Sequence, residues 1–172
     1  MVESPTFRSS PLLAPVNARM TTPTTDIALA RPIDVPPLVQ LVRHYWENEQ
    51  LKPFNADAIS KLIADIVSLP ELGQCWVARN ANGMQGYLIC SCVPSFEYGG
   101  LLALIADLYV APDARRSGVG QQLVHAAEHA MRARGCVHIA MEVAQRNIRA
   151  QQFYSILGFA TRAGYSMMHK AL

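Results

Sequence analysis

The feature that most constrains the fold is an apolar strand that runs into a Gly-x-Gly turn and then into an amphipathic helix. Residues 101–110, LLALIADLYV, predict a strand with one charge, Asp107, and the stretch DARRSGVGQQL at 113–123 follows it. Apolar residues then recur at helical spacing as far as Gly135, where a glycine is typical of a helix end. The segment CVHIAMEV at 136–143 predicts the next strand. Strand, helix and strand in this order predict a β-α-β unit with two parallel strands.

The residues outside this unit predict antiparallel pairing and helical cover. Two apolar runs flank Asn82-Gly83 and predict a tight β-hairpin, because both residue types tolerate positive φ. The helix expected after Asn55 would place Ile59, Leu62, Ile63 and Ile66 on one face. The other expected elements are a strand at 26–33, helices at 34–46, 55–69 and 147–158, capped by Asp34, Asn55 and Asn147, and one or two closing strands within 159–172. The fold class is therefore α/β (α+β), a single domain with a mixed, mostly antiparallel central sheet flanked by helices.

Composition is that of one globular domain without a charged tract. Of the 172 residues, 51% are hydrophobic and 16% charged, so the chain can bury a sizeable core. A formal net charge of +2 with no run of Lys or Arg argues against a nucleic-acid partner, and no apolar run is long enough to span a membrane. The four cysteines lack paired metal-ligand spacing, and buried reduced thiols suit a cytoplasmic protein.

The start of the chain predicts a different kind of segment. Residues 1–25 are rich in Pro, Ser and Thr and predict a disordered N-terminal tail, whereas 26–172 form the expected folded domain. Met20 stands just before the expected start of order. We therefore hypothesise that translation can begin at Met20.

The Gly118-x-Gly120 turn predicts an anion site. Unpaired N–H groups and the positive end of a helix favour a phosphate group, and the two glycines allow close approach of the backbone. A dinucleotide fingerprint would need a third glycine where Leu123 stands, although Glu142 lies at about the distance expected of its ribose-binding acid. A P-loop would need Gly-Lys-Ser/Thr, which is missing. A tight strand-to-helix turn that holds no ligand is the alternative interpretation.

Two longer motifs resemble a known family. LYVAPDARRSGVGQQLVHAAEHAMRARG resembles the acetyl-CoA signature of the GNAT N-acetyltransferase superfamily, an Arg/Gln-x-x-Gly-x-Gly/Ala core after a Tyr-Val-x-Pro strand end. MEVAQRNIRAQQFYSILGF resembles the family's later segment, with its Asn, its aromatic-Tyr pair and its Leu-Gly-Phe. The resemblance implies an acetyl-CoA-dependent N-acetyltransferase that transfers acetyl directly to a primary amine. Acetyl-CoA would be the co-substrate, and no metal is expected.

The resemblance also implies a cofactor path. The pyrophosphate would bind backbone N–H groups of residues 115–121, and the pantetheine would run beside the strand at 108–110, where an amide near Leu108 would polarise the thioester carbonyl. Asn147 would either hydrogen-bond the pantetheine or only cap its helix. The expected cofactor-binding residues are Leu108, Tyr109, Val110, Arg115, Arg116, Ser117, Gly118, Val119, Gly120, Gln121 and Asn147.

Three residues are candidates for proton transfer. Tyr154 is the expected acid, since a phenol stays protonated at neutral pH and can protonate the departing sulfur. Glu142 is one candidate base, because its spacing from Tyr154 is similar to the Glu and Tyr pair of ribosomal-protein alanine N-acetyltransferases. Asp107 competes, since a carboxylate within an apolar strand is costly without a purpose. The choice between the two bases is open at this stage.

The acceptor and two other functions also stay open. A small-molecule amine is favoured over a protein N-terminus, and the aromatic and acidic residues expected to receive it are Tyr45, Trp46, Glu47, Glu49 and 96–98. A non-catalytic CoA or nucleotide sensor is the first alternative. The second is a zinc-dependent hydrolase, because His125, Glu128 and His129 match a His-x-x-Glu-His pattern, although they lie on the polar face of their helix. A homodimer is a further open choice.

Overall fold

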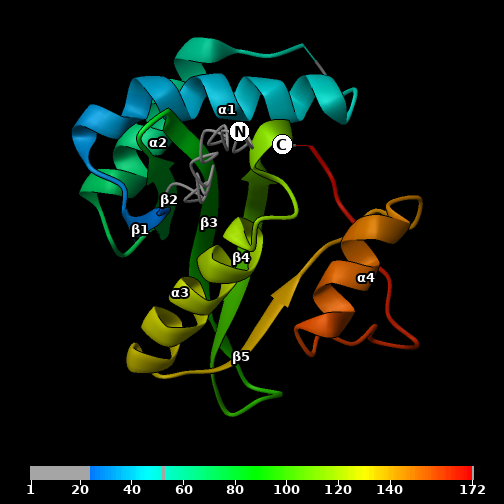
Figure 1. Ribbon diagram of the computed structural model, residues 1–172. Coiled ribbons are helices and arrows are strands. Elements are labelled where there is room, and N and C mark those ends of the chain that lie inside the picture. The colour runs from blue at the N-terminus through cyan, green and yellow to red at the C-terminus, as the bar shows by residue number, and fades with distance from the viewer. Residues whose placement is uncertain (1–23, 52, 172) are drawn as a thin grey trace, which may run out of the picture.

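One five-stranded sheet organises the computed structural model, which describes residues 24–51 and 53–171 (Figure 1). The strand order is β1-β2-β3-β4-β5; neighbours from β1 to β4 are antiparallel, and β4 and β5 are parallel. The hypothesised start at Met20 and most of the predicted tail lie outside the described residues. The strands are β1 (Asp26–Leu29), β2 (Gln74–Asn80), β3 (Gly83–Ser95), β4 (Gly100–Val110) and β5 (Cys136–Met141).

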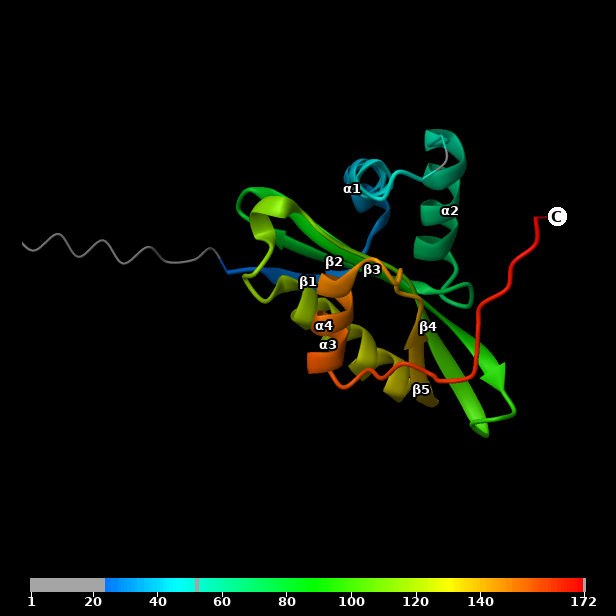
Figure 2. The same cartoon turned by 90° about the vertical axis from the view of Figure 1, so that its right-hand side faces the viewer.

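The helices cover both faces of this sheet (Figure 2). On one face α1 and α2 pack on Val77, Tyr87 and Tyr109, and on the other α3 and α4 pack on a core that includes Leu88 and Cys90. Alternate residues of β3 thus face opposite helical layers, as the two-residue period of a strand requires. The helices are α1 (Val35–Asn48), α2 (Ala56–Ser68), α3 (Val119–Ala133) and α4 (Ile148–Ile156), with 3-10 turns η1 (Pro32–Asp34) and η2 (Pro112–Ala114).

The strands β4 and β5 are paired over only part of their length. Their register runs from Leu101 opposite Cys136 to Ile105 opposite Met141, and β4 continues beyond it (Figure 1). On its other side, β4 contains a β-bulge: Ile105 pairs with Cys90 and Asp107 with Ile89, so Ala106 is the extra residue. A bulge bends the strand and re-aims the next side chain. The β4 residues after the bulge therefore border an opening between the separating strands.

The predicted helix caps are confirmed at two of three positions. The Asn55 side chain accepts a hydrogen bond from the Ala58 amide at 3.0 Å, and Asn147 accepts one from the Ala150 amide at 3.1 Å. Asp34 stands at the start of α1 but makes no side-chain cap. Its buried carboxylate instead accepts hydrogen bonds from the Arg31 amide at 2.7 Å and from Arg79 Nη2 at 2.6 Å. The predicted cap at Asp34 is wrong, because two arginines compete for the carboxylate.

Strand ends and the hairpin turn differ from the prediction by a few residues. Gly83 has a φ of 114° and pairs with Asn80, so the hairpin is connected one position earlier than predicted, by residues 81 and 82. β1 ends at Leu29, before the turn at Pro32–Asp34, and β5 ends at Met141, where its pairing with β4 stops. In α2, Ile63 is buried whereas Leu62 is 53% exposed, so the predicted apolar face is narrower than expected.

The closing strands predicted within 159–172 are wrong for the described residues 159–171, which form no strand. Arg162 donates hydrogen bonds to both carboxylate oxygens of Glu97, at 2.6 and 2.7 Å, and its guanidinium lies 3.6 Å from the centroid of the Tyr165 ring. This segment is therefore tied to the β3–β4 connection through side chains instead of pairing its backbone with β5.

Candidate active site

The chain between β4 and α3 makes a turn that requires glycine at one position. Gly118 has a φ of 86° and stands at the start of α3, and Arg116 two residues earlier has a φ of 65°. The Gln122 amide donates the first bond of the helix to the Gly118 carbonyl, at 3.0 Å. The amides of Val119, Gly120 and Gln121 therefore precede the first intrahelical bond and point out of the helix end. This geometry suits an anion, as the sequence predicts.

Packing also favours glycine at position 120. A Cβ at Gly120 would lie 3.3 Å from Phe153 Cζ and 3.6 Å from Val110 Cγ2. The position therefore brings α3 close to both β4 and α4. A side chain longer than a single methyl group here would push against Phe153 and Val110.

Two side chains stabilise the turn from within. Arg115 Nε donates a hydrogen bond to the Val110 carbonyl at 2.9 Å, and the Arg115 guanidinium lies 5.6 Å from the centroid of the Tyr109 ring. Ser117 Oγ donates to the Ala114 carbonyl at 2.6 Å. Arg116 is exposed, so its charge is available to a ligand at the turn.

Asp107 follows the β4 bulge and lies in a largely apolar setting. The Tyr87 hydroxyl donates a hydrogen bond to Asp107 Oδ2 at 2.7 Å. Burial raises the pKa of Asp107 to about 6, while the hydrogen bonds from Tyr87 and from the Leu108 amide act in the opposite direction. A carboxylate with this pKa is largely ionised at neutral pH and still basic enough to accept a proton.

Tyr154 and Tyr45 lie within electrostatic reach of Asp107. Tyr154, on α4, is 8% exposed, and its ring makes edge contacts with Phe153 and Phe159 at centroid distances of 4.9 and 5.5 Å. Burial, and then the charge of Asp107, raises the pKa of Tyr154. Burial followed by the charges of Asp107 and Glu49 raises the pKa of Tyr45, on α1. Both phenols therefore stay protonated at neutral pH.

The other two candidate side chains, Glu142 and Asn147, have different surroundings from Asp107. Glu142 is exposed and follows the last residue of β5. The side-chain oxygen of Asn147 is used for its cap, which leaves the amide NH₂ for any further contact. Leu108 packs on the α3 face and Tyr109 on the α1 face, and Asn48 Nδ2 donates to the Tyr109 hydroxyl at 3.3 Å. The side chains at 108 and 109 are therefore core, and only their backbone could meet a ligand.

The residues expected to receive the acceptor fall into two distant groups. Glu49 lies near Tyr45 and pairs with Arg146 Nη2 at 3.2 Å, which joins the end of α1 to the β5–α4 connection. The group at 96–98 instead occupies the β3–β4 connection, where Tyr98 stacks on His138 at a ring-centroid distance of 3.8 Å. At about 3.3 Å per residue along β4, this group lies roughly 20 Å or more from Asp107. Of the two groups, only the one on α1, with Tyr45 and Glu49, lies near Asp107.

Sequence reasoning missed Tyr87 and Arg146. Tyr87 is fully buried and reads in the sequence as an ordinary aromatic of the hairpin, and only the cross-strand pairing brings its hydroxyl to Asp107. Arg146 lies in the stretch after β5. Its one signal is its place next to Asn147, inside the second family motif.

The His-x-x-Glu-His pattern lies on the outer face of α3. His125 Nδ1 lies 3.2 Å from Glu128 Oε2, and its Nε2 lies 3.3 Å from Gln121 Nε2. Across residues 24–51 and 53–171, no three side chains among His, Cys, Asp and Glu gather in a way that could hold a metal ion. The same described residues include no helix long and apolar enough to cross a membrane.

Comparison with known proteins identifies the family. The model of the acetyltransferase (GNAT) family matches residues 37–159. Aminoglycoside N(6')-acetyltransferase type 1 of Klebsiella aerogenes is 33% identical over 116 residues, which is 66% of this chain and 76% of that protein. The chain therefore belongs to the GNAT acetyltransferase family, and it is an acetyl-CoA-dependent N-acetyltransferase.

Solved structures agree with this fold. The aminoglycoside N-acetyltransferase AAC(6')-Iy in complex with CoA has a TM-score of 0.77 at 18% identity, covering 89% of this chain and 99% of that one. An aminoglycoside acetyltransferase from an uncultured soil metagenomic sample, in complex with sisomicin, has a TM-score of 0.70 at 20% identity, covering 86% and 96%. The predicted fold class is confirmed. Of the two predicted functions, enzyme and non-catalytic sensor, the family membership supports the enzyme.

Proposed function

We propose that the protein acetylates a polycationic small-molecule amine of the aminoglycoside type, with Asp107 as general base and Tyr154 as general acid. The observation that carries this proposal is the half-buried Asp107 carboxylate beyond the β4 bulge, which accepts a hydrogen bond from Tyr87 and whose charge raises the pKa of Tyr154. The curated relative named above is an aminoglycoside acetyltransferase, and it is 33% identical to this chain.

The turn before α3 supports binding of acetyl-CoA. The amides at the start of α3 and the exposed Arg116 supply donors and positive charge for its pyrophosphate. Gly118 provides the left-handed backbone conformation that exposes those amides. The proposed cofactor-binding residues are those predicted from the sequence, namely Leu108, Tyr109, Val110, Arg115, Arg116, Ser117, Gly118, Val119, Gly120, Gln121 and Asn147.

The proposed reaction is one direct transfer. Asp107 takes a proton from the acceptor ammonium, so that the neutral nitrogen attacks the thioester carbonyl carbon. The backbone amide near Leu108 stabilises the charge that develops on the carbonyl oxygen. The C–S bond then breaks, and Tyr154 donates its proton to the departing sulfur. The attacking nitrogen, which is cationic after it bonds the carbonyl carbon, then loses its second proton, and this proton restores Tyr154 through solvent. Asp107 releases the first proton to solvent, so the products are an amide, CoA thiol and one proton.

The acceptor side supports a cationic substrate. Asp107 and Glu49 place two carboxylates around Tyr45, whose ring can contact an ammonium group. Glu49 is already paired with Arg146 in this structure, so a substrate cation that binds Glu49 has to displace Arg146. Several charges on one acceptor would favour that exchange.

The experiment is an assay of CoA thiol release with three acceptor classes. We expect turnover with aminoglycosides to exceed turnover with monoamines and with peptides that carry a free N-terminus. Faster turnover of the peptides would overturn the proposed acceptor while leaving the acetyltransferase activity intact. Gly120→Glu should abolish acetyl-CoA binding in a thermal-shift assay, because its side chain would enter the space between α3 and Phe153.

A further inference from the structure

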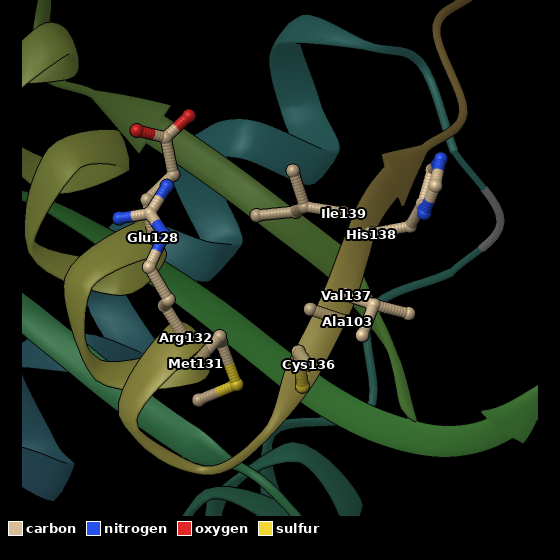
Figure 3. Close-up of a pocket in the computed structure, with 8 residues that line it drawn as sticks. All are labelled: Ala103, Glu128, Met131, Arg132, Cys136, Val137, His138 and Ile139. Atoms are coloured by element: carbon tan, nitrogen blue, oxygen red, sulfur yellow. The ribbon is translucent and has the colours of Figure 1, made fainter. Parts of the chain in front are cut away.

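A cluster of sulfur atoms lies outside the proposed active site. Cys92 Sγ on β3 lies 3.2 Å from Cys136 Sγ at the start of β5 and 3.3 Å from Met131 Sδ on α3. Figure 3 shows the Met131 and Cys136 side chains facing one another across the gap between α3 and β5. Three sulfur atoms from three elements thus meet at one point, and acetyl transfer uses none of them.

The cluster is open to solvent on one side. Met131 and Cys136 line a pocket of about 100 Å³, together with Glu128, Arg132, His138 and neighbouring residues (Figure 3). Met131 stands near the C-terminal end of α3, and Gly118 at the other end, so at about 1.5 Å per residue the two sites lie roughly 20 Å apart. A small ion can therefore reach the sulfur atoms without crossing the cleft.

A disulfide between Cys92 and Cys136 does not fit this backbone. β4 lies between β3 and β5, and Cys92 is opposite Ala103 while Cys136 is opposite Leu101. Strands two places apart in a sheet are separated by roughly 9–10 Å. A disulfide needs Cα atoms within about 7 Å. The two thiols meet only because both reach over the small Ala103.

We propose that Cys92, Cys136 and Met131 form a binding site for a soft monovalent metal ion of the Cu(I) class. Thiolate and thioether ligands select soft ions of this kind. A metal–sulfur bond of about 2.3 Å places the sulfur atoms of a three-coordinate site about 4 Å apart. The contacts of Cys92 Sγ with Cys136 Sγ and with Met131 Sδ would therefore each open by less than about 1 Å, and the unbranched Met131 side chain can make that adjustment.

Binding requires an exchange of protons for the ion. Burial and the contact with Cys92 raise the pKa of Cys136 to about 11, while the charge of Arg134 acts in the opposite direction. Two thiol protons therefore leave to solvent as the two metal–thiolate bonds form, and no oxidant or reductant is consumed. The resulting site carries one net negative charge, which Arg134 partly compensates.

The test is an anaerobic titration of the full-length protein with Cu(I) held by a colorimetric Cu(I) chelator. We expect one Cu(I) per chain. Cys92→Ser and Cys136→Ser should remove it, and Met131→Leu, which conserves volume, should weaken it at least about 10-fold, since even outer-shell partners of metal sites produce such losses. Cys75→Ser is the matched control, because Cys75 is a buried free cysteine that packs on the other face of the sheet.

Two outcomes would overturn the proposal. One is Cu(I) affinity that falls equally in Cys75→Ser, or that survives in the Cys92→Ser/Cys136→Ser double variant, since ordinary thiols would then explain it. The other is full Cu(I) affinity in Met131→Leu, because the Met131 thioether would then not be a ligand of the ion. Neither outcome depends on acetyltransferase activity.

Discussion

Asp107, on β4, and Glu142, just after β5, both stand past the point where the two strands stop pairing, and they differ in burial and in hydrogen bonding. Asp107 is largely buried, bonded to Tyr87, and has a pKa raised to about 6. Glu142 is exposed to solvent beyond the end of β5. Two carboxylates at similar strand positions thus have different chemistry, because only one is desolvated.

The largest expected effect is the difference in activity between variants of these two carboxylates. Asp107→Asn should lower kcat/KM by about 10²–10⁴, the usual contribution of a general base, whereas Glu142→Gln should change it by less than about 2-fold. Initial rates of thiol release at saturating acetyl-CoA measure both. The wild-type profile of kcat/KM against pH should fall on the acid side near 6, and a residual Asp107→Asn activity should lack that limb. The reverse ranking of the two variants would assign the base to Glu142.

Sequence reasoning could not make this distinction, for a physical reason. The burial of Asp107 depends on the bulge at Ala106 and on the pairing of Asp107 with Ile89, and both are set by strand register. No local pattern around residue 107 encodes that pairing. By contrast, the caps at Asn55 and Asn147 were predictable because each side chain bonds an amide only three residues away.

The C-terminal segment illustrates the same limit at the level of the fold. The composition of residues 159–171 predicts one or two strands, but a strand also needs a neighbouring strand to pair with, and that strand lies elsewhere in the chain. Arg162 instead finds Glu97, 65 residues earlier. The element order and the glycine turn could be predicted because each follows from contiguous residues.

The next largest effect concerns Tyr154, the proposed acid. Tyr154→Phe should lower kcat by roughly 10²-fold, at the low end for general acid catalysis, because the phenol that protonates the leaving sulfur is lost. Affinity for acetyl-CoA should change little, since the ring contacts with Phe153 and Phe159 remain. Single-turnover rates and a binding titration separate the two quantities. An unchanged kcat would show that Tyr154 is a packing residue only.

A smaller effect of Asp107→Asn concerns stability: the substitution should stabilise the native state although it lowers activity. Because the pKa of Asp107 rises from 3.8 to about 6 on folding, its ionisation destabilises the native state progressively as pH rises from about 4 to 6. At pH 8 the neutral Asp107→Asn variant should therefore be more stable than the wild type by about 3 kcal/mol, whereas near pH 4 the two should be similar. Urea unfolding at the two pH values measures this. Equal stability at pH 8 would mean that Asp107 is better solvated than its burial indicates, and Glu142→Gln serves as the exposed control.

The smallest expected effect concerns the ion pair between Arg146 and Glu49, which joins the end of α1 to the β5–α4 connection. The Arg146 side chain is 73% exposed and that of Glu49 is 27% exposed, so the pair contributes at most about 1 kcal/mol. If a substrate cation displaces Arg146 from Glu49, then Arg146→Gln should lower KM for a polycationic acceptor by about 2- to 5-fold and leave kcat unchanged. Added salt should shrink the difference, because it screens exposed charges. A monoamine bound at Asp107 alone should show no change in KM, and Glu49→Gln should raise KM for the polycation. An increase in KM on Arg146→Gln would instead make Arg146 a substrate-binding residue and exclude competition for Glu49.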